Sequence, residues 1–175
     1  MPGSREVVLL DPPDLVDDYL TVRLTALGRV ARVTSRAFDD TVRLEELLDR
    51  TVVTDLVVWL PSTGDDTLVR RAVEALMAGV ATSGGSVVAL AGPTVPPERV
   101  DWFRSLHDAY PAVQLHLLRH DPLAGAFWDC RGELQTLATQ GNVPLPVLAS
   151  AVADVMTERT PGFAETTLTA TQEIA

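Results

Sequence analysis

The sequence predicts a single α/β domain with a doubly wound, mostly parallel sheet and helices on both faces. Three observations indicate this fold class. Short apolar runs alternate with segments of helical periodicity, which is the pattern of βαβ units. The runs are apolar at nearly every position, as expected for strands covered on both faces. The 175 residues contain no long linker, so one domain is expected.

The first strand and helix come directly from the apolar pattern. Glu6–Leu10 (EVVLL) is a short apolar strand. Leucine, valine and tyrosine then recur at three- and four-residue spacing over residues 15–27, which predicts a helix ending at Gly28. The alternating segment RVARVTS (29–35) predicts a second strand.

The middle of the chain continues the alternation. A short acidic helix is expected around residues 44–48, and DLVVWL (55–60) is a strand that Pro61 ends. Over residues 66–81 one apolar helical face is formed by Leu68, Val69, Ala72, Val73, Leu76 and Val80. The glycines at 84–85 then break the helix, and Ser86–Ala91 is the next strand.

The last part is less regular. A helix is expected around residues 99–107, a fifth strand at VQLHLL (113–118), and an inward-facing helix at LPVLASAVADVM (145–156). The segment ETTLT (165–169) is expected to form a short closing strand.

Composition excludes several classes of function. Fourteen basic residues against 24 acidic ones give a net charge of −10, which disfavours binding to nucleic acid. No apolar run reaches the length of a membrane helix and no secretory signal is evident, so a cytoplasmic protein is expected. One cysteine and three histidines are too few for a disulfide framework or a structural zinc site. All the basic residues are arginine, so no mechanism here can use a lysine.

Five segments, taken in order, resemble the atypical short-chain dehydrogenase/reductases of the NmrA-like branch. The resemblance spans most of the chain and implies a Rossmann-like fold. The matching segments are DLVVWLPSTGDD (55–66), SVVALAG (86–92), VQLHLLRHDP (113–122), the helix at 147–158 and PGFAETTLT (161–169). The third resembles a family strand that ends in an arginine and a proline beside the substrate pocket. Residues 1–122 would form the core βαβ units, and 123–175 a reduced C-terminal region for the pocket and dimerisation.

The chain departs from the family where the cofactor and the chemistry would be. The turn after the first strand is Asp11-Pro12-Pro13-Asp14, whereas a pyrophosphate needs glycine and free backbone N–H groups. No lysine is present to pair with a catalytic tyrosine, and Ala91 and Gly92 stand where the family has its serine. We therefore expect a degenerate relative that binds no cofactor, neither NAD(P) nor a metal.

Candidate site residues are those that follow the strands, because ligands of such sheets bind beyond the strands' carboxyl ends. His120 is the expected acid–base group, with Arg119 and Asp121 as catalytic partners. Arg119 could clamp a carboxylate or enolate through its planar fork. The alternatives are that His120 is a solvated loop histidine and that Arg119 pairs with Asp121 or with the acidic first turn.

Further ligand contacts are expected from other strand ends and from an aromatic pair. The substrate-binding candidates are Ser62, Thr63, Thr94 and Trp128, and Asp11, Ser35 and Arg36 also follow strands. His116 is expected to be a bonded core histidine and His107 to lie at a helix C-terminus. Cys130 has no neighbouring histidine and is not expected to be a nucleophile.

These features leave the function open between three hypotheses. The first is a cofactor-independent cyclase, dehydratase or isomerase acting on a small, polyketide-like or aromatic molecule in bacterial specialised metabolism. The second is a non-catalytic, NmrA-like ligand-binding, regulatory or partner protein. The third is a receiver-like domain, although the strand at 55–60 lacks its phosphoacceptor aspartate. A homodimer is expected, because Phe127, Trp128 and the C-terminal helix have little to cover them.

Overall fold

A computed structural model of the chain describes the backbone of residues 6–10, 14–28, 30–33, 54–123, 126–128, 134–136 and 142–170, and the side chains of 6–10, 16–28, 54–123 and 142–170. In chain order the elements are β1 (Glu6–Leu10), α1 (Asp14–Ala26), β2 (Val30–Val33), β3 (Asp55–Trp59), α3 (Thr67–Thr82), β4 (Ser86–Ala91), α4 (Pro97–Ala109), β5 (Gln114–His120), β6 (Ala126–Trp128), β7 (Leu134–Thr136), α5 (Leu145–Glu158) and β8 (Gly162–Leu168).

Six strands form one sheet in the order β2-β1-β3-β4-β5-β8, and every neighbouring pair is parallel. From β1 the chain first adds β2 on one side, and it then returns to add β3 and β4 on the other. This reversal is the topological switch of a doubly wound sheet. The fold class predicted from the sequence is confirmed.

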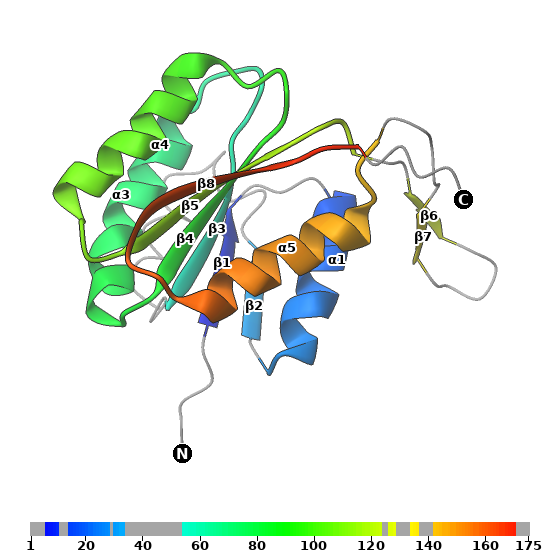
Figure 1. Cartoon of the computed structure of the whole chain (residues 1–175), viewed down its shortest axis with the longest axis horizontal. Coiled ribbons are helices and arrows are strands. Elements are labelled where there is room, and N and C mark those ends of the chain that lie inside the picture. The colour runs from blue at the N-terminus through cyan, green and yellow to red at the C-terminus, as the bar shows by residue number, and fades with distance from the viewer. Residues whose placement is uncertain are drawn as a thin grey trace.

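Helices cover the sheet on both faces (Figure 1). One apolar core lies between the sheet and α3 and α4, and a second lies between the sheet and α1 and α5. Successive residues of a strand supply opposite cores: Leu115 and Leu117 face α4, whereas Leu118 packs with α5. This alternation determines which face each polar residue at the end of β5 can reach.

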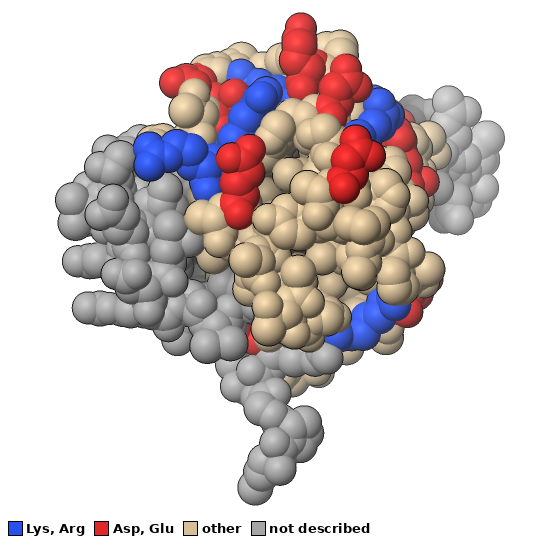
Figure 2. Space-filling view, turned by 90° about the vertical axis from the view of Figure 1, so that its left-hand side faces the viewer, with Lys and Arg blue, Asp and Glu red and all other residues tan. Residues whose placement is uncertain are grey.

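On the side of α3, α4 and β8, acidic and basic side chains lie next to one another, and a continuous uncharged area lies below them (Figure 2). Several charged residues of α3, α4, β8 and the loop before α3 form ion pairs. Arg70 bonds to Asp66 at 2.7 Å within α3 and its preceding loop, and Arg104 of α4 bonds to Glu165 of β8 at 2.9 Å. The paired charges limit the single-sign field that a net charge of −10 would otherwise produce on this side.

The main differences from expectation concern the four strands β5, β6, β7 and β8. β5 continues to His120, two residues beyond the predicted end, because His120 pairs with Leu168 of β8. β8 begins at Gly162, three residues earlier than predicted, so residues after 122 contribute a full strand to the sheet. A small antiparallel pair, β6 and β7, was not predicted. The acidic helix expected at 44–48 lies outside the described residues.

The C-terminal helix is better covered than the sequence suggested. The apolar face of α5, including Leu148 and Val152, is buried against the sheet and α1. What remains exposed is a shallow apolar groove between α1 and α5, next to Val22 (71% exposed) and Val147 (48%). Among the described helices none is both long and apolar enough to span a bilayer.

Candidate functional site

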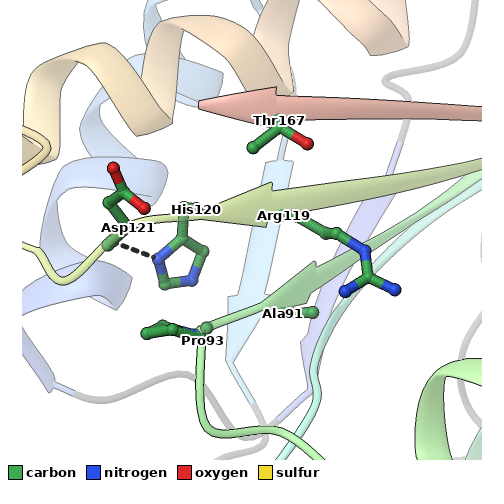
Figure 3. Close-up of a pocket in the computed structure, with 7 residues that line it drawn as sticks. Ala91, Pro93, Arg119, His120, Asp121 and Thr167 are labelled. Atoms are coloured by element: carbon green, nitrogen blue, oxygen red, sulfur yellow. Dashed lines mark hydrogen bonds between the residues drawn. The ribbon is translucent and has the colours of Figure 1, made fainter. Parts of the chain in front are cut away.

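A cavity of about 170 Å³ opens at the carboxyl ends of β4, β5 and β8 (Figure 3). This is the edge at which ligands bind to parallel α/β sheets. The residues that line it are Ala91, Gly92, Pro93, Arg119, His120, Asp121 and Thr167. The structure therefore brings together the three residues predicted to be catalytic.

The cavity exists because small side chains flank a long one. Ala91, Arg119 and Thr167 lie in register across β4, β5 and β8. Alanine and threonine leave space on both sides of the Arg119 stem, and Gly92 adds no side chain beyond Ala91. A bulky residue at either flanking position would fill the cavity.

His120 is the last residue of β5 and is only 5% exposed, so it is not the solvated loop histidine considered from the sequence. Its Nδ1 lies 2.9 Å from the backbone oxygen of Asp121. Because a carbonyl oxygen only accepts, this contact assigns the hydrogen to Nδ1 and leaves a lone pair on Nε2. Among the described residues Nε2 has no hydrogen-bond partner, and it exposes less than 1 Å².

The surroundings of His120 favour its neutral form. Burial lowers the pKa of His120, and this outweighs the bond to the Asp121 carbonyl and the charge of Asp121, which act in the opposite direction. The indole ring of Trp59 packs against the imidazole with ring centroids 5.5 Å apart. The ring is therefore held in place as a neutral, unbonded base.

Gly92 faces the Cε1–Nε2 edge of this imidazole. A Cβ at position 92 would lie 3.5 Å from Cε1 and 3.9 Å from Nε2 of His120. The missing side chain leaves a methyl-sized gap over the edge that carries the free lone pair. We expect a reacting atom to approach Nε2 through this gap.

Arg119 pairs with Glu165 rather than with Asp121, and the side chains of the first turn lie outside the described residues. Its Nε donates to Oε1 of Glu165 at 2.6 Å, and Arg104 donates to the other oxygen at 2.9 Å. The hydrogen bond from Arg104 is the main cause of the lowered pKa of Glu165. In Figure 3 the Arg119 guanidinium extends away from the His120 ring, as expected for successive residues of a strand.

Asp121 also differs from its expected role. Its Oδ2 accepts a hydrogen bond from the backbone N–H of Ala170 at 2.8 Å. Its carboxylate points away from the guanidinium of Arg119 in Figure 3. Asp121 therefore fixes the chain after β8 and, through its backbone oxygen, the orientation of His120.

Three of the predicted substrate-binding residues, Ser62, Thr63 and Thr94, are not among the described residues that line this cavity. Ser62 and Thr63 are exposed in the loop after β3, where Arg99 binds the backbone oxygens of Pro61 and Thr63. Thr94 is exposed on the turn beyond Pro93. For Trp128 only the backbone, in β6, is described.

The other histidines lie where the sequence placed them. His116 is 7% exposed, and its Nε2 lies 2.8 Å from the hydroxyl of Thr166, which confirms a bonded core histidine. His107 lies in the last turn of α4. The side chains of Asp11, Ser35, Arg36, Phe127 and Cys130 lie outside the described residues. Within the described ranges, no three His, Cys, Asp or Glu side chains gather as metal ligands.

Four residues of the site were missed: Trp59, Gly92, Glu165 and Thr167. The resemblance had named Gly92 only as a missing serine. Alternation along the closing strand could have placed Glu165 and Thr167 on one face, but only the pairing of β8 with β5 shows that this face meets Arg119. No sequence signal indicated that Trp59 packs on His120.

No protein-family profile and no curated protein sequence matches the chain. Solved structures do match its fold. UDP-N-acetylglucosamine 4-epimerase from Bacillus cereus is similar with a TM-score of 0.66 and 10% identity, over 95% of this chain and 78% of the epimerase. An alcohol dehydrogenase from the archaeon Thermococcus sibiricus, complexed with 5-hydroxy-NADP, gives 0.64 and 10%, over 98% and 99% of the two chains.

A short-chain dehydrogenase/reductase family oxidoreductase from Brucella ovis, solved with a partially ordered NAD, has a TM-score of 0.57 and 10% identity, over 95% of this chain and all of the other. At this identity the likeness concerns the arrangement of the backbone. The chain therefore has the Rossmann-like α/β fold found in short-chain dehydrogenase/reductase and epimerase structures.

Proposed function

We propose that the protein is a cofactor-independent enzyme that moves a proton on a small carbonyl compound, with His120 as the base. The observation that carries this proposal is the unbonded Nε2 of a buried, neutral histidine at the edge of a cavity. An isomerase, a dehydratase or a cyclase would all use such a group.

The chemistry follows from the positions of the polar groups. Nε2 of His120 takes a proton from the carbon next to the carbonyl, and the electron pair of that C–H bond moves to the carbonyl oxygen as an enolate. The positive charge of Arg119, which lines the same cavity, favours the enolate over the neutral ketone. The imidazolium keeps its Nδ1–H bond to the Asp121 carbonyl and returns the proton to a different atom, or it gives the proton to a β-hydroxyl group that the enolate expels as water.

We propose that the protein uses no nicotinamide cofactor, because two features of its sequence disfavour binding of one. Asp11-Pro12-Pro13-Asp14 replaces a glycine turn, and no lysine exists to hold a cofactor ribose. Both features support a degenerate branch of the reductase fold, of the NmrA-like kind. The cavity of about 170 Å³ is below the range of about 300–1,000 Å³ for larger ligands. It suits a small molecule or the reacting end of a polyketide-like one.

The test is exchange of substrate protons with D₂O, followed by ¹H NMR over a panel of small ketones, 2-oxo acids and 1,3-dicarbonyl compounds. His120→Gln should lower the exchange rate by about 10²–10⁴-fold, as loss of an acid–base group does. His116→Asn is the matched control, because His116 is buried on the same face of β5 with Nε2 already bonded.

Thermal melts establish that both variants fold. Unchanged exchange in a folded His120→Gln protein, or no exchange with any compound of the panel, would overturn the proposal. The protein would then be a non-catalytic ligand-binding or partner protein, which was the second hypothesis from the sequence.

A further inference from the structure

We infer that the ligand of this cavity is a small carboxylic acid, held through its carboxylate by Arg119 and Thr167. The reaction of this ligand rests on the proposed function, whereas the binding of its carboxylate does not depend on that function. The inference assigns a substrate class and an anchoring role, where the proposed function required only a carbonyl group.

The guanidinium of Arg119 has an unused binding edge. A guanidinium carries five N–H groups, and the described contact of Arg119 uses only Nε, which donates to Glu165. Within the described residues no hydrogen bond involves Nη1 or Nη2 of Arg119. The side chain is 42% exposed and lines the cavity. Two parallel N–H groups of this kind match the two oxygens of a carboxylate.

The ion pair with Glu165 holds Arg119 in position but neutralises only part of its positive charge. Glu165 also accepts a hydrogen bond from Arg104, so one carboxylate is shared between two guanidinium groups. The second acidic group near the cavity, Asp121, is bonded to the backbone of Ala170 and points away. A ligand carboxylate would therefore meet a fixed and only partly neutralised cation.

Thr167 supplies a second donor beside the guanidinium. It is the direct neighbour of Arg119 across the β5–β8 pairing, is exposed, and lines the cavity. No hydrogen bond of its hydroxyl is found among the described residues. Ala91, on the other side of Arg119, is too small to block the approach.

The same placement selects acids whose reactive carbon is close to the carboxylate. Arg119 and His120 are consecutive residues, and both line one small cavity. Because the cavity is small, we expect a short acid, and a 2-oxo or 3-oxo acid has its acidic C–H within a few bonds of its carboxylate.

Pyruvate and its uncharged methyl ester distinguish this inference from the proposed function. Binding is measured by ligand-observed NMR titration, and C3–H exchange in D₂O is followed in parallel. We expect the native protein to bind pyruvate in preference to the ester. Arg119→Gln should weaken pyruvate binding about tenfold, as expected for loss of a charge-assisted pair, and leave ester binding unchanged. Arg71→Gln, an exposed arginine of α3, is the charge-matched control.

Equal affinity for acid and ester, or unchanged pyruvate affinity in folded Arg119→Gln, would overturn the inference. The two proposals can fail independently. Arg119-dependent pyruvate binding without proton exchange would support the carboxylate site and contradict the proton-transfer function. Exchange that depends on His120 and is as fast for the ester as for the acid would support the function and contradict the carboxylate site.

Discussion

Replacing Gly92 by alanine should greatly slow proton transfer while leaving the protein at least as stable as before. Gly92 is not among the glycines with positive φ, which are Gly28, Gly64, Gly84 and Gly162. The backbone at 92 therefore accepts an L-residue. The new Cβ would meet His120 at 3.5 Å and 3.9 Å, which are ordinary van der Waals distances.

The substitution is expected to raise the free energy of unfolding slightly and to lower the rate of proton transfer. Where the native backbone suits alanine, a Gly→Ala change stabilises a protein by about 0.4–1 kcal/mol, because the unfolded chain loses freedom. A base must lie about 2.6–3.2 Å from the atom that it deprotonates. The methyl group would occupy the gap from which a substrate atom reaches Nε2, so turnover should fall by about 10²–10⁴-fold.

The assay combines a urea melt with the D₂O exchange measurement on the most reactive compound of the panel. Gly92→Ala should show an equal or higher denaturation midpoint together with loss of exchange. A stable Gly92→Ala protein that exchanges substrate protons at the native rate would show that the lone pair of His120 is not approached from this side. An unstable variant would contradict the packing argument itself.

Four further predictions concern stability at low pH, the packing around Gly85, the binding of nicotinamide cofactors and the oligomeric state. Burial lowers the pKa values of both His116 and His120, so the unfolded chain protonates first on acidification. Stability should be complete above about pH 6.5 and decrease below it; a melting temperature equal at pH 7 and 5.5 would contradict this. Gly85→Ala would place a Cβ 1.6 Å from the Thr54 oxygen and should cost about 3 kcal/mol or more, measured as a lower urea midpoint. Calorimetric titration should detect no low-micromolar binding of NAD(H) or NADP(H), given the turn at 11–14. Light scattering should show a dimer, and a monomer would refute this expectation. The α1–α5 groove is the surface at which substitutions should disrupt the dimer.

The fold could be predicted from the sequence because apolar strands and helical spacing are local signals. Ser86–Ala91 has the same bounds in the sequence analysis and in the structure, and each of its residues is buried. The end of β5 could not be predicted, because His120 joins the strand only through its pairing with Leu168, 48 positions later in the chain. Polar residues that complete a strand by long-range pairing give no local strand signal.

The candidate site was predictable in position but not in its contacts. The general rule for parallel sheets directs attention to Arg119, His120 and Asp121, and all three line the cavity. The rule says nothing about partners, so Glu165 was missed and Asp121 was considered as the partner of Arg119. Ser62 and Thr63 also follow a strand, but the loop that carries them is bound by Arg99, away from the cavity.

The position of β8 at the edge of the sheet links ligand binding to the order of that edge. β8 supplies Thr167 and Glu165, and its neighbour β5 is separated from it along the chain by β6, β7 and α5. An edge strand with exposed residues opens locally at a lower free energy than a central strand. Each such opening would remove one donor from the cavity and release Arg119. A ligand that bridges Arg119 and Thr167 should therefore slow hydrogen exchange of the β8 amides that pair with β5, with little effect on β3 or β4.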